Sequence, residues 1–147
     1  MPQVDFYILP GTDSAARLKF ACRLIEKAYL SAQTTLVRVD DEAQLESIDT
    51  LLWTFADRAF VPHDRLGRDG TATALVMLTV GTLTNPPPSY TVLVDLALNC
   101  DAVAGEPPRL IEIVDADETR RRRGRERFRT YRDRGWTPTT HNIDQDS

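Results

Sequence analysis

A strand, a helix and a second strand follow one another in the first 39 residues, and this order restricts the possible folds more than any other feature. Residues 4–9 (VDFYIL) are β-branched and aromatic and precede Pro10-Gly11, which is typical of a largely buried strand. In residues 15–30, apolar side chains recur at three- and four-residue spacing, which predicts an amphipathic helix. Residues 34–39 are again strand-like. Because strands joined through a helix lie parallel in one sheet, we expect an α/β fold.

The rest of the chain continues this alternation. A helix is expected from residue 42 to 55, with Asp40 or Asp41 as its cap, and a last helix runs from Asp115 or Asp117 towards Trp136. Further strands are expected at residues 72–81, 90–96 and 110–114. We therefore predict a single domain over residues 1–136. It should be a three-layer sandwich with a mostly parallel, Rossmann-like sheet of about five strands and helices on both faces. Residues 137–147 lack a pattern and should form a loosely held tail.

The last predicted helix is rich in arginine. Residues 120–136 hold nine of the 18 Lys+Arg residues against two acidic ones, although the whole chain has a net charge of −4. On a helical wheel a narrow stripe, Gly124, Phe128 and Tyr131, runs beside a row of arginines, Arg121, Arg125 and Arg132. This pattern predicts a helix that docks by its aromatic residues and offers guanidinium groups to an acidic partner. By pattern alone it also fits a solvated helix face.

Large apolar residues gather after the second predicted helix. Trp53, Phe55, Phe60, Val61 and Pro62 fall within ten residues and are followed by a histidine. A connecting loop normally carries less apolar surface. The segment is therefore either a loop folded over the core or a partly exposed patch that docks a partner protein.

The sequence shows no motif for nucleotide binding, metal binding or catalysis. The first turn after a strand, residues 9–14, has one glycine, whereas a dinucleotide fingerprint needs three and a phosphate-binding loop needs a lysine. The two histidines, His63 and His141, and the two cysteines, Cys22 and Cys100, are too scattered to indicate a metal cluster or a catalytic triad. We expect no enzymatic activity of the chain's own, no cofactor and no metal.

Composition limits the setting and the partners. No apolar run approaches the roughly 20 residues of a membrane span, and the N-terminal residues do not resemble a signal peptide, so we expect a cytoplasmic protein without a membrane partner. A pI near 5.2 argues against non-specific nucleic-acid binding as the main function. Direct binding of nucleic acid through the arginine-rich helix stays open as an alternative.

Three segments together resemble the chi subunit of the bacterial DNA polymerase III holoenzyme. They are VDFYIL, then DEAQLESIDTLLWTFADRAFVPH, and EIVD followed by RGRERFRTYRDRGW. The resemblance covers residues 4–136. Its most specific parts are the Leu-Trp pair followed by Phe-Val-Pro-His (residues 52–63), and the arginine and aromatic run at residues 125–136.

This resemblance implies a non-catalytic adaptor of DNA replication. Chi subunits pair with the psi subunit of the clamp loader and hold the acidic C-terminal tail of single-stranded DNA-binding protein, so they meet DNA only indirectly. Some members also bind a DNA-repair helicase at the psi-type face. By similarity, the psi or helicase surface contains Trp53, Phe60, Val61, Pro62 and His63, and the tail-binding surface contains Arg121, Arg125, Phe128, Arg132 and Trp136.

The sequence departs from the familiar family pattern at three of these positions. Arg121 stands where a lysine is familiar, Phe128 where a tyrosine is, and Trp136 where a phenylalanine is. The missing hydroxyl at Phe128 removes one hydrogen bond but keeps the apolar wall, so we expect the tail site to persist with an altered affinity.

Overall fold

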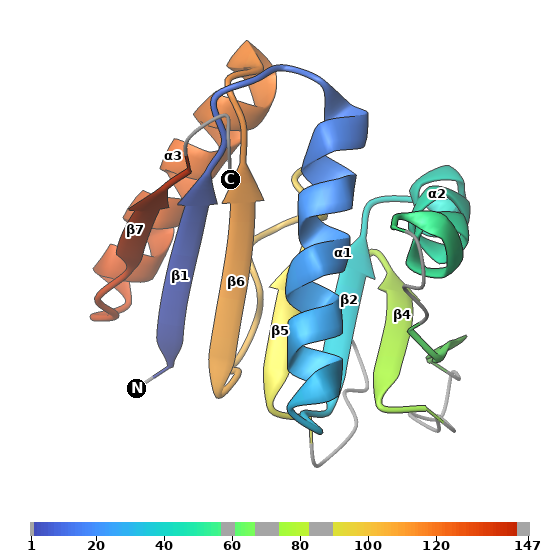
Figure 1. Ribbon diagram of the computed structural model, residues 1–147. Helices are drawn as coiled ribbons and strands as arrows, with labels where there is room; N and C mark the ends of the chain where they lie inside the picture. The colour runs from blue at the N-terminus through green and yellow to red at the C-terminus, as the bar shows by residue number, and fades with distance from the viewer. Residues whose placement is uncertain (1, 57–60, 67–73, 83–89, 144–147) are drawn as a thin grey trace.

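The predicted strand, helix and strand at the start of the chain are present in the computed structural model, which describes all residues except 1, 57–60, 67–73, 83–89 and 144–147. The elements in chain order are β1 (Gln3–Ile8), α1 (Ser14–Leu30), β2 (Thr35–Val39), α2 (Glu42–Thr54), β3 (His63–Arg65), β4 (Val76–Val80), β5 (Val92–Asp95), β6 (Arg109–Val114), α3 (Glu118–Asp133) and β7 (Thr139–Asn142). Figure 1 shows their arrangement.

One aspartate caps each helix. The side chain of Asp13 accepts from Ala15 N at the start of α1, and the side chain of Asp41 accepts from Gln44 N at the start of α2. Asp117 accepts from the backbone nitrogen of Arg120 at the start of α3. A carboxylate there satisfies backbone N–H groups that have no partner within the helix, and it favours the positive end of the helix dipole.

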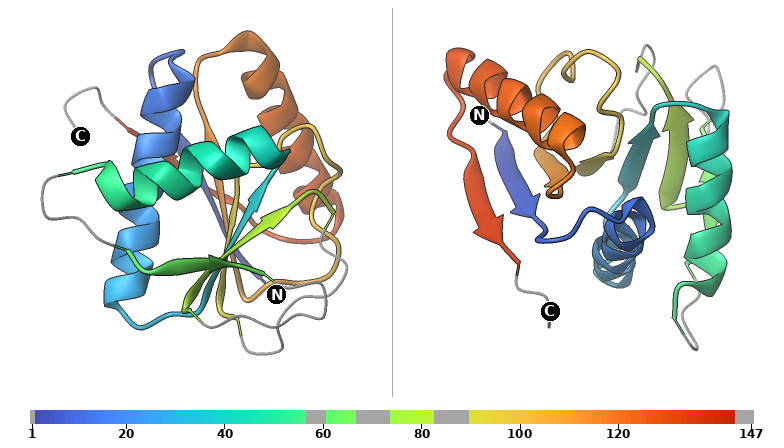
Figure 2. Two further views of the ribbon diagram at one scale, coloured as in Figure 1. Left: turned by 90° about the vertical axis from the view of Figure 1, so that its right-hand side faces the viewer. Right: turned by 90° about the horizontal axis from the view of Figure 1, so that it is seen from above.

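The strands form one sheet in the order β3-β4-β2-β5-β6-β1-β7, and every neighbouring pair is parallel. Helices α1 and α2 cover one face and α3 covers the other (Figure 2). The predicted three-layer α/β sandwich is confirmed. The number of strands was wrong, because seven rather than five are present among the described residues.

The two unpredicted strands are the two edges of the sheet. β3 has three polar residues, and β7 has four, so neither shows the apolar pattern that reveals a buried strand. The predicted loose tail is therefore wrong for Thr139–Asn142, which pair with β1. His141 strengthens this pairing, because its Nε2 lies 2.8 Å from Asp5 Oδ1 and its ring stacks on Tyr7.

Alternating residues of the central strands build two cores. Val37 and Val94 face α1 and α2, whereas Leu36 and Leu93 face α3. All four side chains are fully buried. This two-sided burial explains why the central strands are almost continuously apolar in the sequence.

α3 packs tightly against the sheet at Gly124. A Cβ atom at this position would lie 2.6 Å from Val114 Cγ2, so the helix can sit this close only because a glycine is present. Further along the helix, the fully buried Tyr131 packs near Phe6 and stacks on Trp136, with ring centroids 5.3 Å apart. The prediction that this helix docks by its glycine and aromatic stripe is confirmed.

The substitution Gly124→Leu should destabilise the protein. Leucine forms helix better than glycine, but its side chain has no room against Val114, so we expect the free energy of unfolding to fall by about 1 to 3 kcal/mol. Arg122→Leu is a matched control, because it adds the same side chain at an exposed position of α3 and should change the stability by less than about 0.5 kcal/mol. Urea unfolding of both variants measures the difference. Equal stabilities would show that α3 does not depend on this close approach.

Candidate functional site

A cavity of about 310 Å³ lies between α3 and the edge of the sheet formed by β1 and β7, and we call it the α3 cavity. It is lined by Phe6, Ile8, Val114, Arg121, Gly124, Arg125, Phe128 and Thr140. Three of the five predicted tail-binding residues, Arg121, Arg125 and Phe128, therefore share one cavity.

The floor of the α3 cavity is apolar. Phe6 and Ile8 from β1 and Val114 from β6 face α3, and the half-buried Phe128 forms a wall, with its ring centroid 5.2 Å from that of Phe6. Thr140 brings β7 to the opposite side. Phe128 is thus fixed by a neighbouring ring and still lines open space.

The rim of the α3 cavity is cationic. Arg121 and Arg125 are one helical turn apart, and both are exposed. Within the part of the chain that the structure describes, neither guanidinium group has an ion pair or a hydrogen bond. Both charges are therefore available to a ligand that presents carboxylates above an apolar group.

Arg127, two residues from Arg125, points the other way. Its guanidinium group is buried, lies 2.8 Å from Asp95 Oδ2 and 3.3 Å from Glu112 Oε2, and also donates to the carbonyl groups of Ala97 and Cys100. Asp95 in turn accepts two hydrogen bonds from Arg38, at 2.9 Å each. We call Arg38, Asp95, Glu112, Arg127 and Tyr131 the buried charge network; it ties α3 to β2, β5 and β6.

The buried charge network was not predicted from the sequence. Two signals were available: Asp95 and Glu112 interrupt the apolar strand segments YTVLVDL and LIEIV, and Arg127 follows the buried Gly124 by three residues. A buried carboxylate needs a partner, and an arginine on the buried side of a helix is a natural one.

Glu112 is the least satisfied member of the network. Its Oε2 accepts from the Tyr131 hydroxyl at 3.2 Å, whereas its Oε1 is fully buried without a hydrogen-bond partner among the described residues. Burial and the nearby charge of Asp95 raise the pKa of the Glu112 carboxyl well above its usual value.

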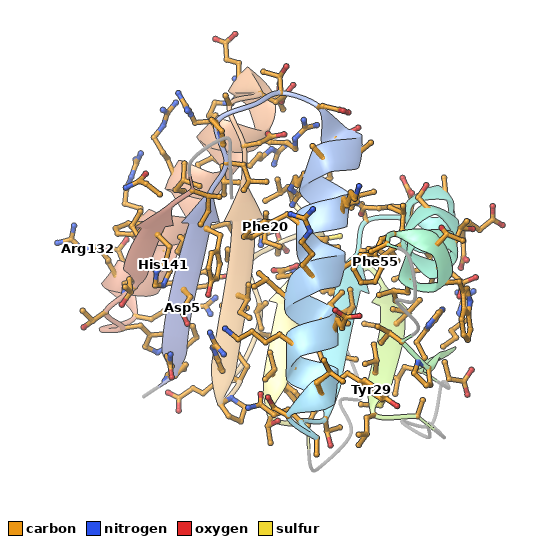
Figure 3. The ribbon with its side chains drawn as sticks, viewed as in Figure 1. Asp5, Phe20, Tyr29, Phe55, Arg132 and His141 are labelled. Atoms are coloured by element: carbon orange, nitrogen blue, oxygen red, sulfur yellow. The ribbon has the colours of Figure 1, made fainter. Side chains whose placement is uncertain are left out.

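The other two predicted tail-binding residues lie outside the α3 cavity. Arg132 is exposed on the last turn of α3 and lies at the outer edge of the molecule (Figure 3). Trp136 is 6% exposed and stacks on Tyr131, and the guanidinium carbon of Arg134 lies over both rings, 5.5 Å from the Tyr131 centroid and 5.2 Å from the Trp136 centroid. Its position supports the end of the helix rather than the cavity.

The predicted psi-type surface divides between core and exterior. Trp53 is 41% exposed, and its ring centroid lies 4.6 Å from that of His63. The side chain of His63 is buried beneath it and contacts Asp49 and the carbonyl group of Val61. Val61 is fully buried in the core, Pro62 is half-buried, and Phe60 lies outside the described residues.

The described residues contain neither a metal-binding cluster nor a membrane-spanning helix. No group of three or more His, Cys, Asp or Glu side chains there could hold a metal ion. Among the same residues, no helix has the length and apolarity that crossing a membrane requires.

The chain is similar to known proteins over nearly its whole length. Residues 1–139 match the family described as DNA polymerase III chi subunit, HolC. The DNA polymerase III subunit chi of Pseudomonas aeruginosa is 35% identical over 144 residues, covering 97% of this chain and 98% of the relative. The subunits of the same name from Haemophilus influenzae and Escherichia coli are 25% and 22% identical, over 95% of this chain and over 96% and 97% of the relatives.

Glu112→Gln should remove a pH dependence of the stability. Since the pKa of Glu112 is raised in the folded chain, its contribution is full below its ordinary pKa of 4.5 and is lost as the pH rises through the folded pKa. Glutamine does not titrate, so we expect the free energy of unfolding of the variant, relative to the unaltered chain, to increase as the pH rises above 4.5. Urea unfolding at a series of pH values measures this. A difference that stays constant across the range would contradict the raised pKa.

Proposed function

The chain belongs to the family of DNA polymerase III chi subunits, and we propose that it is a non-catalytic accessory subunit of that polymerase. In this role it links the clamp loader, through the psi subunit, to the acidic C-terminal tail of single-stranded DNA-binding protein during DNA replication. It would work in the cytoplasm with the replication machinery and meet DNA only through these partners.

The observation that carries the proposal is the α3 cavity. It combines an apolar floor with two exposed guanidinium groups that have no carboxylate partner among the described residues. An acidic peptide end with an apolar side chain offers the complementary groups. Its carboxylates can pair with Arg121 and Arg125, and its apolar side chain can lie against Phe128.

The network beneath α3 supports the same proposal. Because Asp95 and Glu112 are buried and already contact Arg127, these acids do not compete for Arg121 and Arg125. We include Arg132 at the far end of the proposed tail contact, one turn beyond Phe128, and we give Trp136 a supporting position behind Tyr131.

For the psi subunit, or for a DNA-repair helicase at the same face, we propose the surface around Trp53. This large aromatic side chain is exposed, and it rests on His63, whose ring is held by Asp49. Aromatic residues of this kind are enriched at stable interfaces. We add the half-buried Pro62 to this surface, and Val61 supports it from the core. Phe60 is included by the resemblance alone, because it lies outside the described residues.

Arg125→Ala should weaken binding of an acidic tail peptide. The lost charge-assisted contact is worth about 1.5 to 3 kcal/mol, so we expect affinity to fall about 10- to 150-fold. Arg129→Ala is the matched control, because Arg129 is exposed on α3 but does not line the cavity. Fluorescence anisotropy with a labelled tail peptide measures both, and the affinity of the unaltered chain should fall with added salt.

Two results would reject the tail-binding proposal. One is full peptide affinity in the Arg125→Ala variant. The other is steep, salt-dependent binding of a bare oligonucleotide in the absence of single-stranded DNA-binding protein, which would favour direct nucleic-acid binding through the exposed arginines of α3.

Trp53→Ala should weaken psi association by about 30-fold or more, as expected for an interface hot spot of at least 2 kcal/mol. Since Trp53 is 41% exposed, the melting temperature should change little. Leu30→Ala is the control, because Leu30 is apolar and 74% exposed on a different helix, α1. Calorimetric titration with purified psi subunit measures the affinity. A large fall in melting temperature with unchanged psi affinity would make Trp53 a structural residue.

A further inference from the structure

Arg17 is a buried cation without a carboxylate partner. Its side chain is 3% exposed, its Nε donates to the carbonyl oxygen of Ile113 at 2.8 Å, and its Nη2 donates to that of Leu96 at 3.4 Å. The described residues provide no ion pair for it, unlike the buried Arg38 and Arg127. Burial and the charge of Arg120 lower the pKa of Arg17, and the more distant carboxylates of Asp115, Glu112 and Asp95 offset this lowering only in part.

Arg17 lines a cavity of about 340 Å³, which we call the α1 cavity. The α1 cavity lies on the α1 face of the sheet, whereas the α3 cavity lies on the opposite face. Leu9, Phe20 and Ile143 give it apolar walls. Phe20 projects from α1 and packs on Tyr7 of β1, with ring centroids 5.6 Å apart (Figure 3).

The nitrogen Nη1 of Arg17 lacks a hydrogen-bond partner among the described residues. Within this part of the chain, Glu112 Oε1 is the one fully buried side-chain polar atom without a partner, so Nη1 is not such an atom. Nη1 is therefore not fully buried, and Arg17 lines both the α1 cavity and a neighbouring cavity of about 500 Å³. An anion in the cavity would supply the missing counter-charge.

Two more cations from α1 line the same cavity. Lys19 and Arg23 are exposed, and in the described part of the chain neither has an ion pair or a hydrogen bond. The two carboxylates that also line the cavity are already engaged: Asp115 accepts two hydrogen bonds from Arg120, and Asp13 caps α1. The cavity is therefore cationic as well as apolar.

We propose that the α1 cavity binds a short acidic peptide segment that carries an apolar side chain. Carboxylates of the segment pair with Arg17, Lys19 and Arg23, and its apolar side chain lies among Leu9, Phe20 and Ile143. A phosphate ligand fits less well, because Asp13 occupies the start of α1 where the N–H groups of a helix would hold a phosphate. This site shares no lining residue with the α3 cavity.

The test uses the full chain carrying Arg125→Ala, which disables the α3 cavity. The probe is a synthetic peptide of four aspartates followed by a phenylalanine with a free carboxylate, titrated at about 50 mM salt, where charge pairing is weakly screened. Backbone amide NMR signals at Gly11, Arg17, Lys19 and Arg23 should shift on titration. Adding Lys19→Glu and Arg23→Glu should weaken binding by about tenfold or more.

Lys27→Glu is the matched control for this experiment. Lys27 is exposed on the same helix but does not line the cavity, so its reversal should change the affinity by less than about twofold. A peptide with asparagine in place of aspartate should bind at least about tenfold more weakly, because it keeps the shape and loses the charge.

Three outcomes would overturn the inference: no shifts at α1, equal affinity after reversal of Lys19 and Arg23, or equal binding of the asparagine peptide. None of these outcomes bears on the α3 cavity. If the α3 cavity does not bind the tail peptide, Arg125→Ala will not weaken tail-peptide binding in the otherwise unaltered chain.

Discussion

The salt bridges between Arg127 and the carboxylates of Asp95 and Glu112 fix α3 on the sheet, and the geometry of the α3 cavity depends on them. Such a buried pair contributes little net stability when intact, but removing one partner leaves an uncompensated charge in the core. The salt bridges of Arg127 therefore act mainly by orienting α3 on the sheet. With Arg127 turned inward, Arg125 and Phe128 are directed to the cavity at the edge of the sheet.

The sequence predicted most of the fold because the signals were local and repeated. Apolar periodicity defined the helices, and continuous apolar runs defined the central strands, which are buried on both faces. β3 and β7 gave no such signal. They are short and polar, and β7 is stabilised by pairing with β1 and by the contact between His141 and Asp5, neither of which is local in sequence.

Only part of the candidate site could be predicted from the sequence, because the same residue type can be exposed at one position and buried at another. Arginine on α3 is exposed at Arg125 and buried at Arg127, and only the partners on other strands distinguish them. Apolar residues carry the same ambiguity. Val61 and Trp136 resemble interface residues in the sequence but belong to the core, whereas Trp53 is exposed.

β7 has a consequence that reaches beyond its four residues. Thr140 lines the α3 cavity, and Ile143, just after the strand, lines the α1 cavity, with its backbone nitrogen bonded to Ile8 O. A peripheral strand thus serves as a shared boundary for two concave surfaces on opposite sides of one sheet. Local fraying of β7 would open both cavities together. A ligand that binds one cavity only when β7 is paired would therefore protect this segment against hydrogen exchange and strengthen ligand binding at the other cavity.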